Sequence, residues 1–172
     1  MNSNFEHCLK KLLAHEGGFS NHSQDPGGMT NIGVTARVWE EWVGHPVNEK
    51  QMRNLTPELV APLYKRKYWD ACRGDELISG LDYCVFDVAV NSGVGRAIKF
   101  LQSCVGATVD GGFGPNTMAL VKKAEENPVS LIEEYCDIRL QFLKSLKVWP
   151  VFGKGWERRV NEVQADSLKM LG

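Results

Sequence analysis

The sequence predicts a mainly α-helical protein, with a helical body around one buried central helix and a small hairpin lobe near residues 17–35. Three observations lead to this fold class. Apolar residues recur three and four positions apart over most of the chain, which is typical of amphipathic helices. Residues 76–91 are apolar nearly all round, which indicates a helix buried on every side. Residues 17–33 are rich in Gly, Asn, Ser, Asp and Pro, which favours loop and hairpin over helix.

The first half of the chain gives clear helix starts. Residues 4–14 carry apolar side chains on one face, and the pattern breaks at Gly17 and Gly18. Thr35 is expected to cap a short helix that carries Trp39 and Trp42. Thr56 followed by Pro57 predicts a further helix to about residue 68.

The second half reads as helices separated by short turns. The central helix over 76–91 is followed by a helix that ends at Gly106. A glycine-rich turn over 110–114 leads into a helix near 115–125, and Asn127-Pro128 opens what we expect to be the longest helix. Val160 and Val163 lie on a final helix that begins near Trp156. Four tryptophans at amphipathic spacing are assigned to the core: Trp39, Trp42, Trp149 and Trp156.

Composition limits the classes of partner. The 172 residues include 20 Lys+Arg and 21 Asp+Glu, so the net charge is -1, and 43% of residues are hydrophobic. This favours one globular domain over residues 1–172, expected to be a monomer. No excess of positive charge is present to displace counterions from phosphates, which argues against nucleic acid as a partner.

Targeting and metal signals are missing from the sequence. No stretch approaches the roughly 20 apolar residues of a membrane span, and no signal-peptide pattern is seen, so we expect no stable membrane insertion and synthesis in the cytoplasm. The five cysteines form no CxxC pair and are expected to be small buried hydrophobes. No metal and no cofactor are predicted.

A candidate catalytic site follows the first helix. Glu16 ends the apolar-faced helix, Asp25 follows after eight residues, and Thr30 follows after four more. Cleavage of a glycosidic bond needs a protonated carboxyl group and a second group that places water or stabilises positive charge. Partial burial at the helix end favours the uncharged acid at Glu16, whereas Asp25 on a polar hairpin would stay ionised. By spacing alone, an ordinary helix end and an Asp-Pro turn explain these residues better than catalysis does.

The stretch HEGGFSNHSQDPGGMTNIGVT, residues 15–35, resembles the signature of glycoside hydrolase family 108, the N-acetylmuramidases of phages and prophages. The resemblance implies a lysozyme-like α+β fold with a saccharide cleft. It also implies a lysozyme activity (EC 3.2.1.17) that cuts the β-1,4 bond between N-acetylmuramic acid and N-acetylglucosamine in bacterial peptidoglycan. The family's catalytic glutamate corresponds to Glu16. Related phage-type lysozymes have eight and then five residues between their Glu, Asp and Thr, so Thr30 here lies one residue closer to Asp25 than that pattern expects.

The resemblance continues into the second half. DVAVNSGVGRAIKFLQ and VDGGFGPNTM resemble the C-terminal region that the family describes as a predicted peptidoglycan-binding segment, here about residues 85–170. This region either binds peptidoglycan separately or completes the catalytic fold. The apolar central helix favours completion, because helices from both halves are needed to cover it.

Further candidate contacts are polar or aromatic residues expected near the cleft. Asn91 lies one helical turn after Asp87, and the pair either makes structural hydrogen bonds or lets Asn91 hold an acetamido or hydroxyl group of the sugar. Tyr64, Tyr68 and Trp69 either stack on sugar rings or pack in the core.

Two other functions, a non-catalytic binding module and a zinc amidase, are alternatives to a glycosidase. A non-catalytic peptidoglycan-binding or phage structural module on the same scaffold would bind saccharide without cutting it. A zinc amidase would need a ligand set, but the four histidines form no HExxH and no convincing two-His-plus-carboxylate set. For a phage endolysin that causes cytolysis, the family resemblance implies action on the wall in the periplasm after holin-dependent release from the host cytoplasm.

Overall fold

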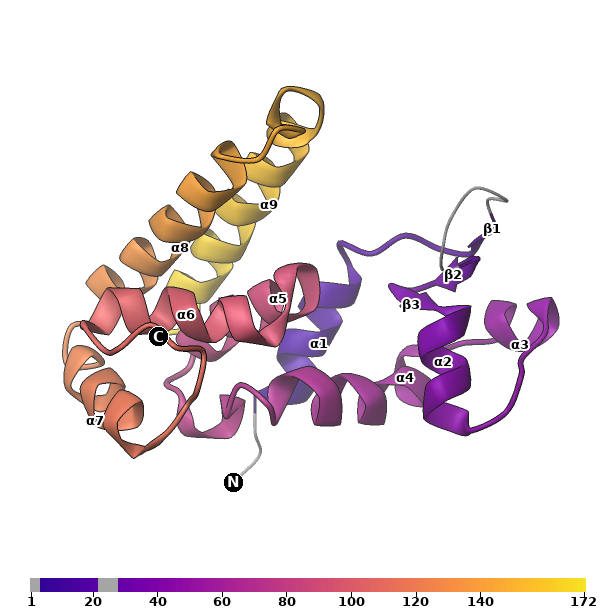
Figure 1. The fold of residues 1–172 in the computed structure, drawn as a ribbon, viewed down its shortest axis with the longest axis horizontal. Helices are drawn as coiled ribbons and strands as arrows, with labels where there is room; N and C mark the ends of the chain where they lie inside the picture. Colours follow the sequence, from indigo (N-terminus) through magenta and orange to yellow (C-terminus); the bar gives the residue numbers. More distant parts are fainter. Residues whose placement is uncertain (1–3, 22–27) are drawn as a thin grey trace. The chain divides into compact units, whose positions relative to one another are not determined.

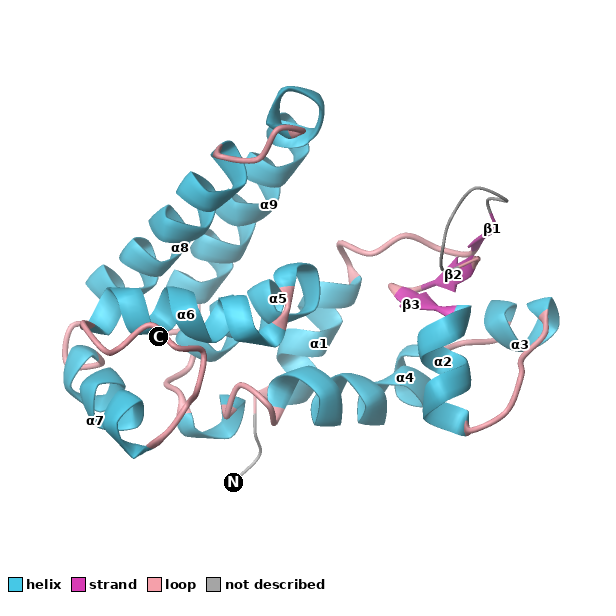
Figure 2. Cartoon of the chain, in the orientation of Figure 1, coloured by secondary structure: helices cyan, strands magenta, loops and turns pink. Residues whose placement is uncertain are grey.

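The computed structural model describes residues 4–21 and 28–172, and these residues are mainly helical, as predicted. The chain forms two compact units. One unit is Phe5–Lys67, and the other combines Asn4 with Tyr68–Gly172. Figure 1 labels the elements along the chain, and Figure 2 shows that the strands are confined to one small sheet.

The unit Phe5–Lys67 begins with α1 (Phe5–Leu13), which buries its apolar face as the sequence predicted. Three short antiparallel strands follow: β1 (Ser20–Asn21), β2 (Met29–Asn31) and β3 (Val34–Thr35). Ser20 pairs with Thr30, and Thr30 pairs with Thr35, so Thr30 lies on the central strand. The predicted hairpin lobe is therefore a three-stranded sheet in its described part.

Three helices complete this unit. The side chain of Thr35 accepts a hydrogen bond from Val38 N and caps α2 (Ala36–Val43), as predicted. A capping box between Asn48 and Gln51 starts α3 (Glu49–Arg53), a helix that the sequence analysis missed. Thr56 caps α4 (Pro57–Tyr64), also as predicted, and a π-helical turn, η1 (Lys65–Trp69), continues it.

The other unit is built around α5 (Leu81–Ser92). A short 3-10 turn, η2 (Gly74–Glu76), precedes it, and α6 (Val94–Val105), α7 (Pro115–Ala124), α8 (Pro128–Lys144) and α9 (Trp149–Lys169) follow. Helices α6, α8 and α9 pack against α5, and all nine residues Leu81–Ala89 are buried. The central buried helix is confirmed. It begins at Leu81 instead of residue 76, because Gly80 adopts φ 94°, which is not a helical conformation, directly before it.

Asp87 is a charged residue inside this buried helix. It is fully buried and accepts hydrogen bonds from Arg139 (Nη1 to Oδ2, 2.7 Å) and from Arg159 (Nη2 to Oδ1, 2.9 Å). Burial opposes ionisation of Asp87, but the two guanidinium groups outweigh it and lower its pKa. The structural alternative for Asp87 is thus confirmed: it joins α5 to α8 and α9.

The glycine-rich turn after α6 is organised by one buried side chain. Gln102 accepts hydrogen bonds from Asp110 N (3.1 Å) and Gly111 N (2.9 Å), and it donates to Asp110 Oδ1, Gly112 O and Thr117 Oγ1. These five bonds join the loop to the start of α7. The VDGGFGPNTM motif therefore has a structural role that is independent of any ligand.

Three expectations from the sequence need correction. α9 begins at Trp149, well before residue 156, and its 21 residues make it longer than the 17 of α8. Trp42, Trp149 and Trp156 were assigned to the core, but Trp42 is 37% exposed and the other two are half-buried. Of the cysteines, Cys104 is half-buried and the other four are buried. None of the helices in the described ranges combines the length and hydrophobicity that crossing a membrane requires.

Candidate active site

Glu16 lies in the turn that follows α1, three residues after the helix ends at Leu13. Its backbone N–H donates to the carbonyl of Leu13 (3.1 Å), and that of His15 donates to the carbonyl of Leu12 (3.0 Å), so a tight last turn fixes the position of both residues. Glu16 is half-buried, and the next two residues, Gly17 and Gly18, are exposed. The first helix ends at Leu13, three residues before the predicted end at Glu16, so Glu16 lies in the turn that follows the helix.

The loop between β2 and β3 is a two-residue hairpin turn. Asn31 pairs with Val34, which leaves Ile32 (φ 43°) and Gly33 (φ 80°) as the turn residues. Positive φ at both positions is the geometry that matches the twist of the strands in such a turn. For a β-branched residue such as Ile32 this conformation is strained, and strain of this kind is concentrated at functional sites.

The turn brings bare backbone against the carboxyl group of Glu16. A Cβ atom added at Gly33 would lie 3.1 Å from both Cγ and Cδ of Glu16 and 2.6 Å from the hydroxyl oxygen of Tyr64. Only glycine allows this approach, because a Cβ contact below 3.0 Å forces a neighbour to move. Glu16, Tyr64 and the β2–β3 turn therefore form one cluster, which is the candidate active site.

Side-chain hydrogen bonds hold the turn in place. The hydroxyl group of Tyr64 on α4 donates to the carbonyl of Ile32 (3.0 Å). Asn31, which is buried, donates to the carbonyl of Met52 on α3 (2.8 Å). The guanidinium of Arg53 stacks on the ring of Phe19 at 3.9 Å from its centre, which anchors the lobe to the end of α3. The strained turn is thus fixed from two helices of the same unit.

Of the other two predicted members of the catalytic group, the structure describes only Thr30. Thr30 is half-buried on β2, and since strand side chains alternate, it lies on the face of the sheet opposite Asn31 and α3. Asp25 lies outside the described residues. The roles of both residues stay predictions.

The aromatic residues expected at the cleft are largely buried. Tyr64 and Trp69 are each 1% exposed. The indole N–H of Trp69 donates to Asp75 (2.8 Å), and its ring makes an edge contact with Phe86. This burial gives both rings a packing role, and the prediction that they stack on sugar draws no support from it. Tyr68 is half-buried, and burial raises the pKa of its hydroxyl group.

Asn91 lies in the other unit, at the end of α5. It is exposed and lines a pocket of about 510 Å³ with residues of α6, α8 and α9. Arg96 stacks on Phe142 in the same pocket, at 4.2 Å from the ring centre. The pocket gives Asn91 access to a ligand, and its role in holding saccharide stays a prediction.

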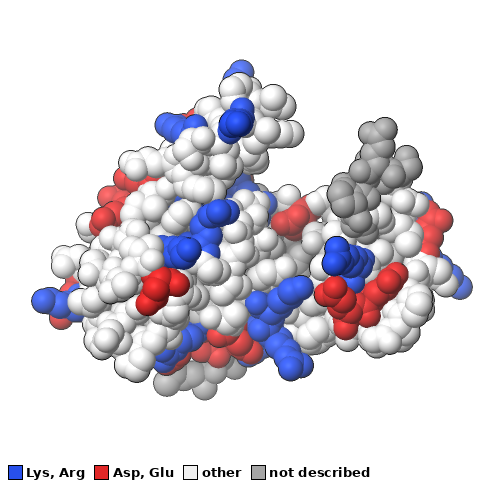
Figure 3. Space-filling model, viewed as in Figure 1, with Lys and Arg blue, Asp and Glu red and all other residues white. Residues whose placement is uncertain are grey.

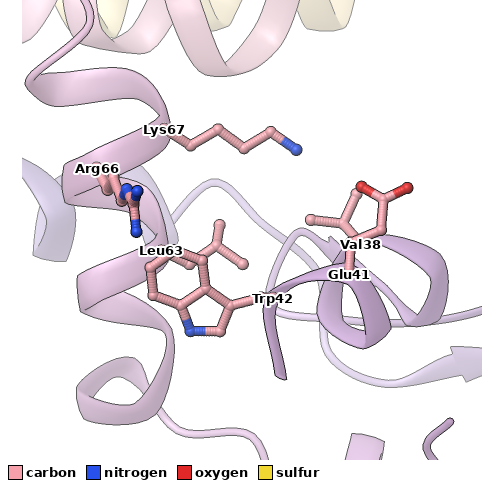
Figure 4. Close-up of a pocket in the computed structure, with 6 residues that line it drawn as sticks. All are labelled: Val38, Glu41, Trp42, Leu63, Arg66 and Lys67. Atoms are coloured by element: carbon pink, nitrogen blue, oxygen red, sulfur yellow. The ribbon is translucent and has the colours of Figure 1, made fainter. Parts of the chain in front are cut away.

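A smaller pocket lies within the unit of Glu16, between α2 and the end of α4. Its volume is about 350 Å³, and the exposed Trp42 forms one wall (Figure 4). In this view Lys67 extends across the opening toward Glu41, while Arg66 lies beside the indole ring. The pocket explains why Trp42 is not in the core: its indole covers Leu63 and leaves the other side open.

Sequence analysis missed Ile32, Gly33 and Asn31 as parts of the site. A two-residue turn is best signalled by Asn-Gly or Asp-Gly, whereas Ile is disfavoured at a positive φ, so the local sequence gave no such signal. The described residues contain no group of three or more His, Cys, Asp or Glu side chains arranged to hold a metal ion.

Comparisons with known proteins identify the family of the chain. The family model described as glycosyl hydrolase 108 matches residues 9–93, a range that contains the end of α1, the sheet and Asn91. A solved structure of SagA from Brucella abortus is similar over 97% of this chain and 95% of that chain, with 37% sequence identity and a TM-score of 0.84. The chain belongs to glycosyl hydrolase family 108. No curated protein gives a match.

Membership of family 108 bears on the whole predicted site. The matched range includes all six residues singled out from the sequence: Glu16, Asp25, Thr30, Tyr64, Trp69 and Asn91. The similarity to SagA extends beyond this range to the helices α6–α9. The second half is thus shared with this structural relative.

Proposed function

We propose that this family 108 glycosyl hydrolase is an N-acetylmuramidase that cleaves the β-1,4 bond between N-acetylmuramic acid and N-acetylglucosamine in peptidoglycan, with Glu16 as the general acid. Family membership supports the reaction class. The observation that carries the residue assignment is the position of the Glu16 carboxyl group against the bare backbone of Gly33.

Glu16 is suited to deliver a proton because its position is fixed. The turn after α1 holds its backbone, and Gly33 and Tyr64 limit the movement of its side chain. In the proposed reaction the glycosidic C–O bond breaks, the leaving oxygen takes the proton of Glu16, and a water molecule adds to the anomeric carbon. The water's second proton restores the acid. A fixed acid of this kind contributes roughly 10²–10⁴-fold to the rate.

Asp25 and Thr30 are proposed to act on the other side of the reacting sugar. A carboxylate can stabilise the positive charge that develops on the ring, and a threonine hydroxyl can orient the attacking water. The half-buried position of Thr30 on the central strand supports its part in this proposal.

Peptidoglycan is the proposed partner, and the reaction needs neither metal nor cofactor. We also propose that the enzyme works as a monomer on the wall in the periplasm. A phage origin with holin-dependent release stays a prediction from the sequence resemblance, and the similar SagA comes from the bacterium Brucella abortus.

The test is release of reducing ends from purified peptidoglycan in the presence of EDTA. We compare wild type, Glu16→Gln and Glu58→Gln, since Glu58 is an exposed glutamate on α4 of the same unit. Glutamine keeps the shape of glutamate but donates no acidic proton, so Glu16→Gln should lose roughly 10²–10⁴-fold in rate. Glu58→Gln should match wild type.

Other outcomes point to other functions. Release of amino groups without new reducing ends would move the chemistry to the peptide stem. Binding to the wall without cleavage by wild type would favour the non-catalytic module. Full activity of a folded Glu16→Gln enzyme would refute Glu16 as the acid.

A further inference from the structure

The helical hairpin α8–α9 ends in an exposed apolar surface. We name residues 144–158 the hairpin tip; it comprises the end of α8, the connecting turn and the start of α9. Eight large hydrophobic side chains are exposed in the described residues, and three of them lie within five positions here: Val148 (45%), Val151 (76%) and Phe152 (52%). Such clustering is unlike the scattered exposure that is normal for a soluble surface.

The aromatic residues of the hairpin tip pack on one another. The Phe152 and Trp156 rings are stacked with their centres 5.6 Å apart, and the Trp149 and Trp156 centres are 6.3 Å apart. The ring of Trp149 also covers Gly153, where an added Cβ would lie 2.6 Å from the indole. These contacts give the tip a firm aromatic base, from which the side chains of Val148 and Val151 extend into solvent.

Positive charge surrounds this apolar surface. Four exposed cations lie in the hairpin tip, namely Lys144, Lys147, Lys154 and Arg158, against one carboxylate, Glu157, which is half-buried. The chain as a whole has a net charge of -1, so the excess of positive charge is local. Figure 3 shows Lys and Arg atoms beside uncharged surface at this end of the hairpin.

We propose that the hairpin tip binds the surface of a bilayer that contains anionic phospholipids. Valine and phenylalanine side chains would enter the boundary between headgroups and acyl chains, while the lysines and the arginine contact phosphates. This binding is peripheral and needs no membrane-spanning helix.

The chemistry of the tip favours a bilayer over a saccharide. Sugars are held by open ring faces together with hydrogen-bond acceptors and donors, but here Phe152 and Trp156 cover each other and the outermost side chain is the aliphatic Val151. The carboxylate groups of peptidoglycan would pair with the cations, but peptidoglycan offers no apolar phase for the exposed valine and phenylalanine side chains. An anionic bilayer matches both the apolar surface and its charged surround.

The test measures co-sedimentation of the whole chain with vesicles. Wild type should bind vesicles of phosphatidylglycerol mixed with phosphatidylcholine, bind pure phosphatidylcholine much more weakly, and lose affinity as salt is raised. Lys147→Glu with Lys154→Glu should weaken binding to the mixed vesicles by at least roughly 30-fold. Val151→Ser with Phe152→Ser should weaken it by at least roughly 10-fold.

Matched variants separate the tip from general charge and hydrophobicity. Lys50→Glu with Lys123→Glu makes the same change in net charge at exposed lysines elsewhere, and Leu59→Ser with Val129→Ser removes two other exposed apolar side chains. Both controls should bind like wild type. Thermal unfolding checks that each variant is folded. If the Phe152 variant proves unstable, the charge variants still test the proposal, because they change only exposed side chains.

Several results would overturn the proposal. Wild type that does not bind the mixed vesicles excludes an anionic bilayer, and equal losses in the tip and control variants exclude the tip as the contact. Loss of wall binding by the tip variants without vesicle binding would indicate a wall ligand. A dimer that dissociates when Val151 and Phe152 are changed, again without vesicle binding, would indicate a second copy of the chain.

Discussion

Replacing Gly33 with alanine tests whether the backbone beside Glu16 must remain bare. The new methyl group would lie 2.6 Å from the hydroxyl oxygen of Tyr64 and 3.1 Å from Cγ and Cδ of Glu16. The Tyr64 hydroxyl must move by most of an ångström and loses its hydrogen bond to Ile32. The Glu16 side chain must shift by a few tenths of an ångström.

The expected size of the effect follows from these contacts. Placing an L-residue at φ 80° costs roughly 1–2 kcal/mol, and losing the Tyr64 hydrogen bond costs roughly 0.5–1.5 kcal/mol. The free energy of unfolding should therefore fall by roughly 2–3 kcal/mol, which lowers Tm by roughly 4–12 °C in a chain of this size. Misplacing the acid should lower kcat/KM for peptidoglycan by roughly 10–100-fold at temperatures where the variant is folded.

Gly44→Ala is the matched control. Gly44 has φ 83° at the end of α2, but an added Cβ there meets no atom within 4 Å. It should lose stability from backbone strain alone and keep its activity. Combining Gly33→Ala with Tyr64→Phe removes the closest contact and should recover part of the stability. Full activity of folded Gly33→Ala, or an equal loss of activity in Gly44→Ala, would refute the reasoning.

Three further substitutions test the supports of the fold. Tyr64→Phe removes the hydrogen bond that holds the strained turn, so the free energy of unfolding should fall by about 1 kcal/mol and reducing-end release should fall. Tyr68→Phe should leave that hydrogen bond unchanged. Gln102→Met leaves the loop's amide and carbonyl groups without their buried partner and should cost roughly 2–3 kcal/mol in urea unfolding; no loss would show that water replaces it. Asp87→Asn leaves the buried guanidinium group of Arg139 without its carboxylate partner and should cost roughly 3–5 kcal/mol at pH 7. Because the pKa of Asp87 is lowered, its contribution is present above about pH 4 and is lost as pH falls through the lowered value, so Tm of the Asn variant should fall less steeply below pH 4 than that of wild type.

Local chemistry explains which elements could be predicted from the sequence. Thr35 and Thr56 begin helices because their hydroxyl oxygens accept backbone N–H groups three residues later, a bond that depends only on neighbouring residues. Gly106 ends α6 in the left-handed conformation for an equally local reason. Asn48 and Gln51 make a capping box of the same kind, so α3 was also within reach of the sequence.

Other features depend on packing that residue preferences and spacing do not reveal. Two glycines, Gly153 and Gly155, count against a helix that begins at Trp149, because glycine lowers helix propensity. The helix forms because the Trp149 ring packs on the bare backbone of Gly153, a contact that residue preferences do not reveal. Trp42 was placed in the core from amphipathic spacing, but spacing does not show that the pocket beside α4 leaves one side of its indole open.

The same distinction applies to the two glycine-rich motifs. At residues 110–114 the turn is completed by Gln102, so the motif is explained by the protein's own hydrogen bonds and gives no separate evidence for wall binding. At residues 32 and 33 the protein instead maintains a strained conformation, and the bare backbone that results faces a carboxyl group. Strained backbone conformations are concentrated at active sites, where they place reacting groups. The turn at residues 32 and 33 is therefore stronger evidence for function than the turn at 110–114, and the Gly33→Ala and Gly44→Ala pair tests its role directly.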